Sequence, residues 1–345
     1  MADTIRVGII GAGWPGSAHA KGYQQAGGYK SVAVADLIPQ RRKSLMGEFG
    51  LTAEYADWAE LLADPKIDLV SVCLPTDLHV TACLAALRKG KHVICEMPPA
   101  LNAAEAKRME STAAKSGKMM LYAAQRRFGA AEQAAHQAIA KGYAGEIYHA
   151  RASWTRTRGI PIGTGWFTDG SRSGGGALID LGAHMLDLAW YLMGEPVPQS
   201  VFAVGHRKFQ SLTPAEMKND VEDSAFAIVR FEGGKSLELA CSWAINQPPN
   251  QNGTACRIYG DQGAVEVYTP RGPILYRGFE PNGRAKEIQL KQPKSGGHMA
   301  LMRHARDCMI RGAVPISGPA MGVGLMRMID AMYKSAATGK SVSLL

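Results

Sequence analysis

Two residues with side chains suited to proton transfer, Asp180 and His184, stand four positions apart in the sequence. Apolar residues recur around them at helical spacing, so a helix over residues 177–193 is predicted to place both side chains on one face. An imidazole titrates near neutral pH and suits a general base, which Asp180 would orient unless it binds a substrate hydroxyl instead. An isolated pair of this kind is more often a structural histidine with its partner. A metal ion would need a third ligand at suitable spacing, and since none is evident, no metal is expected.

A glycine-rich hexapeptide near the start of the sequence has the pattern G-x-G-x-x-G. It follows an apolar run and opens a predicted helix, the arrangement in which backbone N–H groups approach a pyrophosphate. The residues expected to meet a dinucleotide here are Gly11, Gly13, Trp14, Pro15 and Gly16. Asp36 stands 20 residues after Gly16, where a carboxylate accepts hydrogen bonds from ribose hydroxyls and repels a 2′-phosphate. The pattern therefore predicts NAD(H) rather than NADP(H), with Arg41 nearby as a further cofactor contact.

Four further motifs resemble those of the Gfo/Idh/MocA family of sugar and cyclitol oxidoreductases. They are LPTDLH at residues 74–79, EMP at 96–98, QRRF at 125–128 and GGGALIDLGAHMLD at 174–187. The last is the most specific, because it matches the family's G-G-G-x-L-x-D-x-G-x-H-x-x-D closely. The resemblance covers essentially the whole chain and makes catalytic roles for Asp180 and His184 the preferred interpretation.

The resemblance also implies where the rest of the cofactor lies. Its further contacts are expected from Pro75, Thr76, His79, Glu96, Met97, Gln125 and Trp166. Met97 stands where the family usually has a lysine that relays a proton between ribose and substrate. A thioether carries no exchangeable proton, so acid–base work would rest on His184 alone, unless the substrate geometry differs or turnover is lost.

Substrate contacts are expected from the aromatic and basic residues that lead toward the glycine-rich turn, together with the proton-transfer pair. These residues are Arg126, Trp154, Arg156, Arg158, Asp180 and His184. Aromatic rings suit a sugar or polyol, and arginines favour one that carries an anionic group. We therefore predict an enzyme, an NAD-dependent dehydrogenase acting on a secondary hydroxyl of a sugar, glycoside or cyclitol. The alternatives are an enzyme that cleaves glycosides by transient oxidation and elimination while recycling NAD, and a non-catalytic NAD-binding regulator.

Two domains are predicted around these residues. Over residues 1–125, short β-branched runs alternate with amphipathic helical segments, which is typical of a Rossmann domain with a doubly wound parallel sheet. Its strands are expected at residues 6–10, 32–36, 68–74, 92–96 and 118–123. Residues 126–345 read as an α+β domain for substrate binding and oligomerisation, with a large, open, mostly antiparallel sheet. An open sheet face favours a homodimer or homotetramer formed through it.

Composition excludes several classes of protein. The chain of 345 residues is 46% hydrophobic and 20% charged, as expected for a globular protein without disordered tracts. The net charge of +9 is scattered rather than gathered into basic runs with aromatics, so no nucleic-acid partner is expected. The sequence shows no export signal and no apolar stretch of spanning length, so a cytoplasmic protein without membrane contact is predicted. The six cysteines form no C-x-x-C pair and are expected as buried thiols.

Overall fold

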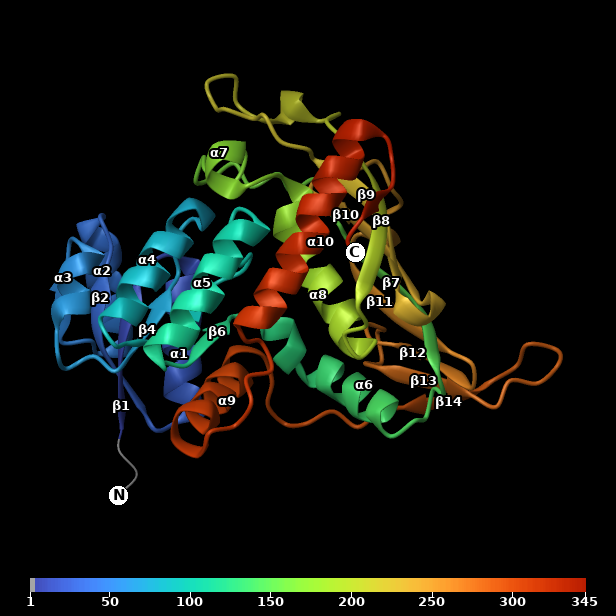
Figure 1. Cartoon of the computed structure of the whole chain (residues 1–345), viewed down its shortest axis with the longest axis horizontal. Helices are drawn as coiled ribbons and strands as arrows, with labels where there is room; N and C mark the ends of the chain where they lie inside the picture. Colours follow the sequence, from blue (N-terminus) through green and yellow to red (C-terminus); the bar gives the residue numbers. More distant parts are fainter. Residues whose placement is uncertain (1–3) are drawn as a thin grey trace. The chain divides into compact units, whose positions relative to one another are not determined.

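Six short parallel strands form the first sheet, in the order β3-β2-β1-β4-β5-β6 (Figure 1). The strands are β1 Ile5–Ile10, β2 Tyr29–Ala35, β3 Ala53–Tyr55, β4 Leu69–Val72, β5 His92–Cys95 and β6 Met120–Tyr122. The intervening helices are α1 Trp14–Ala26, α2 Pro39–Phe49, α3 Trp58–Ala63, α4 Thr76–Arg88 and α5 Ala103–Ser116. Strands β4 and β5 are almost wholly buried, as expected when helices cover both faces of a parallel sheet. The predicted Rossmann domain is confirmed.

This computed structural model describes residues 4–345, which divide into two compact units. The first unit comprises residues 4–128 together with Ser295–Gly324, and the second comprises Gly129–Lys294 with Leu325–Leu345. The sequence predicted one domain boundary at residue 125, with all of residues 126–345 in a single second domain. The structure instead brings helix α9, Gly297–Arg311, back to the first unit.

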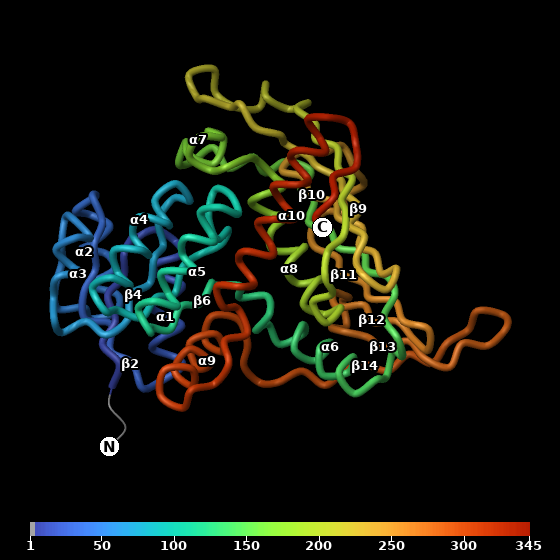
Figure 2. Tube along the Cα trace, in the orientation of Figure 1, coloured from blue at the N-terminus to red at the C-terminus, as the bar shows by residue number. Residues whose placement is uncertain are grey.

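Helix α9 joins the first unit because its apolar side lies in that unit's core. Leu301, Met302 and Ala305 are buried in one cluster with β1 residues such as Val7 and Ile9. Helix α9 packs beside α1, as both views show (Figures 1 and 2). Hydrophobic packing is not directional, so local sequence does not reveal which core an amphipathic helix will join.

The second unit contains a nine-stranded sheet in the order β14-β13-β12-β11-β7-β10-β9-β8-β15. All described neighbours pair antiparallel except β7 and β10, which are parallel. The strands are β7 Ile147–Thr155, β8 Pro198–His206, β9 Ser224–Phe231, β10 Ser236–Ser242, β11 Gly253–Gly260, β12 Gly263–Glu266, β13 Ile274–Arg277, β14 Lys286–Gln289 and β15 Val342–Ser343. The predicted α+β class with a mostly antiparallel sheet is confirmed.

The second unit's helices include α6 Ala130–Ala140, α7 Gly170–Ser173 and α8 Ala183–Leu192. Helix α10, Pro319–Thr338, begins in the first unit and continues into the second. Helix α8 packs on β7, β10 and β11. Several large apolar side chains of the sheet, among them Phe202, Val204 and Ile228, remain exposed.

Two further expectations concern the burial of the cysteines and the absence of a membrane-spanning segment. Five of the six cysteines are buried and Cys308 is partly so, and all are free thiols. Within residues 4–345, no helix combines the length and the hydropathy required to cross a bilayer.

Candidate active site

The glycine loop lies between the end of β1 and the start of α1. Gly11 has φ of +98°, and a Cβ atom there would lie 2.2 Å from the carbonyl oxygen of Cys73. A Cβ on Gly16 would lie 2.1 Å from the carbonyl oxygen of Gly11. Both positions therefore require glycine. Helix α1 has no side-chain cap and no acidic residue in its first turn, so its N-terminal N–H groups suit a phosphate.

Asp36 follows β2 directly and lies beside this loop. Its Oδ2 accepts the N–H of Ala12 at 2.8 Å, and its Oδ1 accepts the N–H of Ile38 at 2.8 Å. Each carboxylate oxygen has a second lone pair with which to accept a ribose hydroxyl. The guanidinium of Arg42 donates to the Asp36 carbonyl oxygen and to Glu54, at 2.7 and 2.8 Å. The neighbouring Arg41 is exposed.

The loops after β4 and β5 hold the next predicted cofactor residues. Pro75 precedes α4, and Thr76 and His79 lie buried in its first turn. The ring nitrogens of His79 face the carbonyl oxygens of Pro98 and Leu74, at 3.0 and 2.8 Å. Burial lowers the pKa of His79 in spite of these two contacts. His79 therefore ties the two loops together.

Two residues of the segment after β6 were also predicted to bind cofactor or substrate. Gln125 and Arg126 lie in a short 3₁₀ turn, Gln125–Phe128. Gln125 Oε1 is buried and has no hydrogen-bond partner within residues 4–345, so it has an acceptor available for a ligand. The neighbouring Arg127 is fully buried and donates to the Ile316 carbonyl oxygen at 2.9 Å, which gives it a structural role in the first unit.

In the second unit, the predicted helix over residues 177–193 starts with a π-helical segment, Leu178–Gly182, before α8 begins. This segment carries Asp180, whose Oδ2 accepts the indole N–H of Trp243 at 2.7 Å. Burial raises the pKa of Asp180, and the Trp243 hydrogen bond and the charge of Arg156 counteract that rise. A π segment is a frequent local feature of functional sites, and sequence periodicity does not reveal it.

His184 lies in the first turn of α8, and Trp154 lies at the end of β7. Their rings are 6.0 Å apart between centroids at an interplanar angle of 50°. The Arg156 guanidinium lies over the Trp154 ring, 5.1 Å from its centroid. Trp154 thus links His184 to Arg156, whose charge acts on Asp180, and the roles of these four residues toward a substrate stay predictions.

Two other predicted residues have different surroundings. Arg158 donates to Asn246 Oδ1 at 2.9 Å and lies over the ring of Phe209, 5.1 Å from its centroid. Trp166 stacks on Phe167 with 3.8 Å between ring centroids. Both residues lie in the second unit, and their roles toward substrate and cofactor stay predictions.

Sequence reasoning did not identify Glu222 as part of this arrangement. Its carboxylate accepts the N–H groups of Gly176 and Leu178, at 3.1 and 2.9 Å, and the hydroxyl of Tyr333 at 3.0 Å. A Cβ on Gly176 would lie 1.8 Å from the Glu222 carbonyl oxygen, which explains the need for glycine there. Burial raises the pKa of Glu222. Glu222 thus caps the helical segment that carries Asp180.

Sequence reasoning did not identify Trp243 as part of this arrangement either. Its side chain is 1% exposed, and its indole N–H donates to Asp180. The sequence offers only a general indication of this contact, because a buried tryptophan usually has a hydrogen-bond acceptor for its N–H. Nothing in the local sequence points to Asp180 as that acceptor.

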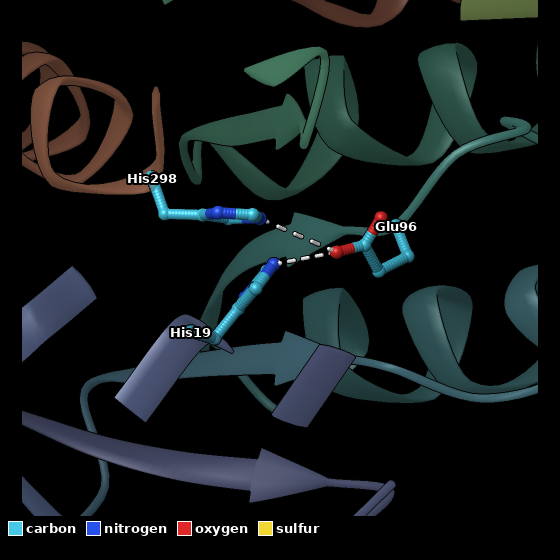
Figure 3. Close-up of side chains that lie close together, drawn as sticks. All are labelled: His19, Glu96 and His298. Carbon is cyan, nitrogen blue, oxygen red and sulfur yellow. Dashed lines mark hydrogen bonds and ion pairs between the residues drawn. The ribbon is translucent and has the colours of Figure 1, made fainter. Parts of the chain in front are cut away.

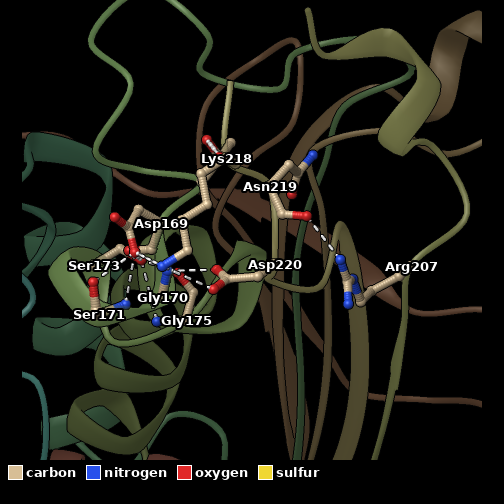
Figure 4. Close-up of polar contacts among 10 residues, drawn as sticks. Asp169, Gly170, Ser171, Ser173, Gly175, Arg207, Lys218, Asn219 and Asp220 are labelled. Carbon is tan, nitrogen blue, oxygen red and sulfur yellow. Dashed lines mark hydrogen bonds and ion pairs between the residues drawn. The ribbon is translucent and has the colours of Figure 1, made fainter. Parts of the chain in front are cut away.

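An ion-pair cluster supports the turn that precedes the three glycines (Figure 4). Lys218 Nζ lies 2.6 Å from Asp169 Oδ1 and 3.1 Å from Asp220 Oδ2. Asp169 also accepts the N–H of Ser171 at the start of α7. The Lys218 and Ser171 contacts lower the pKa of Asp169 to about 2.

A doubly wound sheet with a glycine-rich phosphate loop and an acidic residue after its second strand is the arrangement typical of dinucleotide-binding proteins. Residues 5–124 match the model for the oxidoreductase family with an NAD-binding Rossmann fold, and residues 133–266 match the Gfo/Idh/MocA C-terminal domain. The chain belongs to the Gfo/Idh/MocA family. Its cofactor is NAD, and the predicted enzyme class, an oxidoreductase, is confirmed.

Individual relatives match over most of their length. D-glucoside 3-dehydrogenase of Escherichia coli is 33% identical, with 99% of this chain and 98% of the relative covered. Myo-inositol 2-dehydrogenase of Thermotoga maritima is 29% identical over 79% of this chain and 75% of the relative. A solved structure of levoglucosan dehydrogenase with NADH and levoglucosan superposes with a TM-score of 0.87 at 22% identity, covering 99% of each chain. This last likeness supports the fold.

Proposed function

We propose that this enzyme oxidises a secondary hydroxyl of a sugar, glycoside or cyclitol. The observation that carries the proposal is the group formed by Asp180, His184, Trp154 and Arg156 in the second unit. An indole face packs against the apolar face of a sugar ring, and a guanidinium and a carboxylate bind its hydroxyls. The relatives that act on glucosides, inositol and levoglucosan support the same substrate class.

In the proposed mechanism, the glycine loop and Asp36 would hold NAD, which would supply the acceptor for the hydride that leaves the carbinol carbon. The imidazole of His184 accepts the hydroxyl proton, so that the alcohol becomes a carbonyl. Asp180 is held by the Trp243 N–H and would orient the imidazole or bind a second hydroxyl of the substrate. The residues proposed to hold NAD are those of the glycine loop, Asp36 and the loops after β4, β5 and β6.

Met97 is proposed to leave proton transfer to His184. The thioether has no proton to exchange, and the Met97 N–H donates to the carboxylate of Glu96 at 3.0 Å. Glu96 thereby fixes the backbone of this loop. In reduction, the same His184 would return the proton to the carbonyl oxygen.

The experiment is a panel of glucosides, free sugars and cyclitols incubated with NAD, with NADH absorbance and products measured. D-glucosides come first, because a full-length relative is a D-glucoside 3-dehydrogenase. Accumulation of NADH with a keto product supports the proposal. Release of the aglycone without net NADH would instead indicate oxidation and elimination, and NAD binding with no product from any compound would favour a regulator.

We also propose a homodimer or homotetramer formed through the open face of the second unit's sheet. Phe202 pairs with Ile228 across β8 and β9, and both side chains are exposed, at 45% and 53%. Apolar side chains on a sheet face are typical of an interface between copies. Light scattering of the wild-type chain and of a Phe202→Lys, Ile228→Lys variant tests this, and a monomeric wild type would contradict it.

A further inference from the structure

Three metal-ligating side chains converge in the first unit from distant parts of the sequence (Figure 3). His19 comes from α1, Glu96 follows β5, and His298 lies in the first turn of α9. One ligand atom from each lies within 4.8 Å of the others. His19 Nε2 is 2.9 Å and His298 Nε2 is 3.9 Å from the same oxygen, Glu96 Oε1.

The cluster is shielded from solvent. The side chains of His19, Glu96 and His298 are 0%, 11% and 20% exposed. His298 Nε2 is itself buried and has no hydrogen-bond partner within residues 4–345, although such atoms are normally satisfied. This nitrogen faces, at 3.9 Å, a carboxylate oxygen that already contacts His19, and a cation between the three groups would give it a partner.

The surroundings also hold the ligands in place, as metal sites require. His19 Nδ1 lies 2.8 Å from Ser71 Oγ, which in turn lies 2.7 Å from the Tyr23 hydroxyl. Glu96 Oε2 accepts the N–H of Met97, so Oε1 is left to the two histidines. Ser71 thus orients the ring of His19, and the Met97 N–H orients the carboxylate of Glu96.

We propose that His19, Glu96 and His298 bind a divalent transition-metal ion, with Zn²⁺ the best match. Two imidazoles and one carboxylate form a ligand set that zinc accepts with one position open. At bond lengths of about 2.0–2.1 Å, ligand atoms around a tetrahedral ion lie roughly 3.3 Å apart. The distances of 2.9 and 3.9 Å to Glu96 Oε1 lie on either side of that value.

With a water molecule as the fourth ligand, the bound ion would stabilise the first unit. It joins α9, which returns from the far end of the sequence, to α1 and to the loop after β5. An ion bound only by the folded chain raises its stability in proportion to the logarithm of metal concentration over Kd. Its three ligands do not include Asp180 or His184, so Zn²⁺ binding is testable without any sugar substrate.

The test uses the full chain freed of metal by a chelator and then dialysed. Zn²⁺ titration is followed by calorimetry, bound metal is counted by mass spectrometry, and the midpoint of thermal unfolding is measured with and without Zn²⁺. We expect one Zn²⁺ per chain and a rise in the midpoint. His298→Ala should weaken Zn²⁺ binding by at least about tenfold and abolish the rise, as expected for loss of a direct ligand.

His149→Ala is the matched control, because His149 Nε2 also faces a carboxylate, Glu238, at 3.7 Å but belongs to no three-ligand cluster among the described residues. It should bind Zn²⁺ like the wild type. NAD titration of both variants verifies that the first unit is folded. The proposal is overturned if the wild type takes up no Zn²⁺, or if folded His298→Ala binds it as tightly as the wild type does.

Discussion

The glycine loop of the first unit is formed by residues that lie close together in the sequence. The group around Asp180 in the second unit depends on residues that lie far apart in the sequence. Gly11, Gly16 and Asp36 lie within 25 residues of one another, and neighbouring strands of one sheet position them. Asp180, by contrast, is held by Trp243, 63 positions away. Its helical segment is capped by Glu222, which Tyr333 contacts from 111 positions away.

This difference determines how substitutions should act. The glycine loop would bind the cofactor through its own backbone. Substitutions in this loop should therefore weaken the binding of NAD. A site assembled over long range depends on side chains that never meet the ligand, so changes to Trp243 should alter the pH dependence of catalysis while NAD binding persists.

The largest effect is expected from His184→Ala. Loss of the general base should lower kcat by about 10²–10⁴-fold, because the hydroxyl proton then has no positioned acceptor. The NAD dissociation constant, measured by tryptophan fluorescence, should be unchanged because the loop is in the other unit. His149→Ala serves as the control. Wild-type turnover in His184→Ala would show that the helical pair is structural.

A smaller effect is expected in cofactor choice. If Asp36 binds the ribose hydroxyls, NAD should bind at least about tenfold tighter than NADP, a difference of about 1.4 kcal/mol. Asp36→Ser should narrow that ratio and leave the pH profile of turnover intact. Titration of both cofactors measures this, and equal affinities in the wild type would point to Arg41 as a phosphate contact.

Trp243→Phe tests the long-range support of Asp180. The substitution removes a hydrogen bond to a buried carboxylate, worth about 1.5–3 kcal/mol, so the pKa of Asp180 should rise further. If ionised Asp180 is required, the acid limb of the kcat profile moves to higher pH. A profile identical to that of the wild type would rule out an ionised carboxylate as part of catalysis.

The same substitution has a consequence for stability. Because burial already raises the pKa of Asp180, the folded chain holds that proton more tightly than the unfolded chain does. Stability from this group therefore falls as pH rises from the ordinary carboxyl range toward the folded pKa. In Trp243→Phe the fall should extend to higher pH, which denaturant unfolding at several pH values measures.

The smallest effect is expected from Met97→Lys. If His184 already carries the proton, the added amine should leave kcat unchanged or lower it, because a pocket shaped for a thioether would then hold an ammonium. Turnover on whichever compound the panel identifies, measured across pH, tests this. A rise of orders of magnitude would mean that the natural chain is a weakened dehydrogenase and would favour the regulator.

Much of the first unit was predictable from its sequence. The strands expected at residues 6–10, 32–36 and 92–96 overlap β1, β2 and β5, because buried strands of a parallel sheet are continuous apolar runs. The helix with Asp180 and His184 was predictable from apolar periodicity, and the hairpin of β11 and β12 from its glycines. Strands β13 and β14 were missed, since short, partly exposed strands carry weak signals.

The sequence by itself determined the class of fold, the NAD-binding loop and the spacing of the acid–base pair, because these depend on residues that are neighbours along the chain. Tertiary structure decided that α9 completes the first unit, that Trp243 and Glu222 support Asp180, and that His19, Glu96 and His298 converge. Such contacts depend on which surfaces pack together, and packing acts between residues far apart in sequence, where local patterns carry no information.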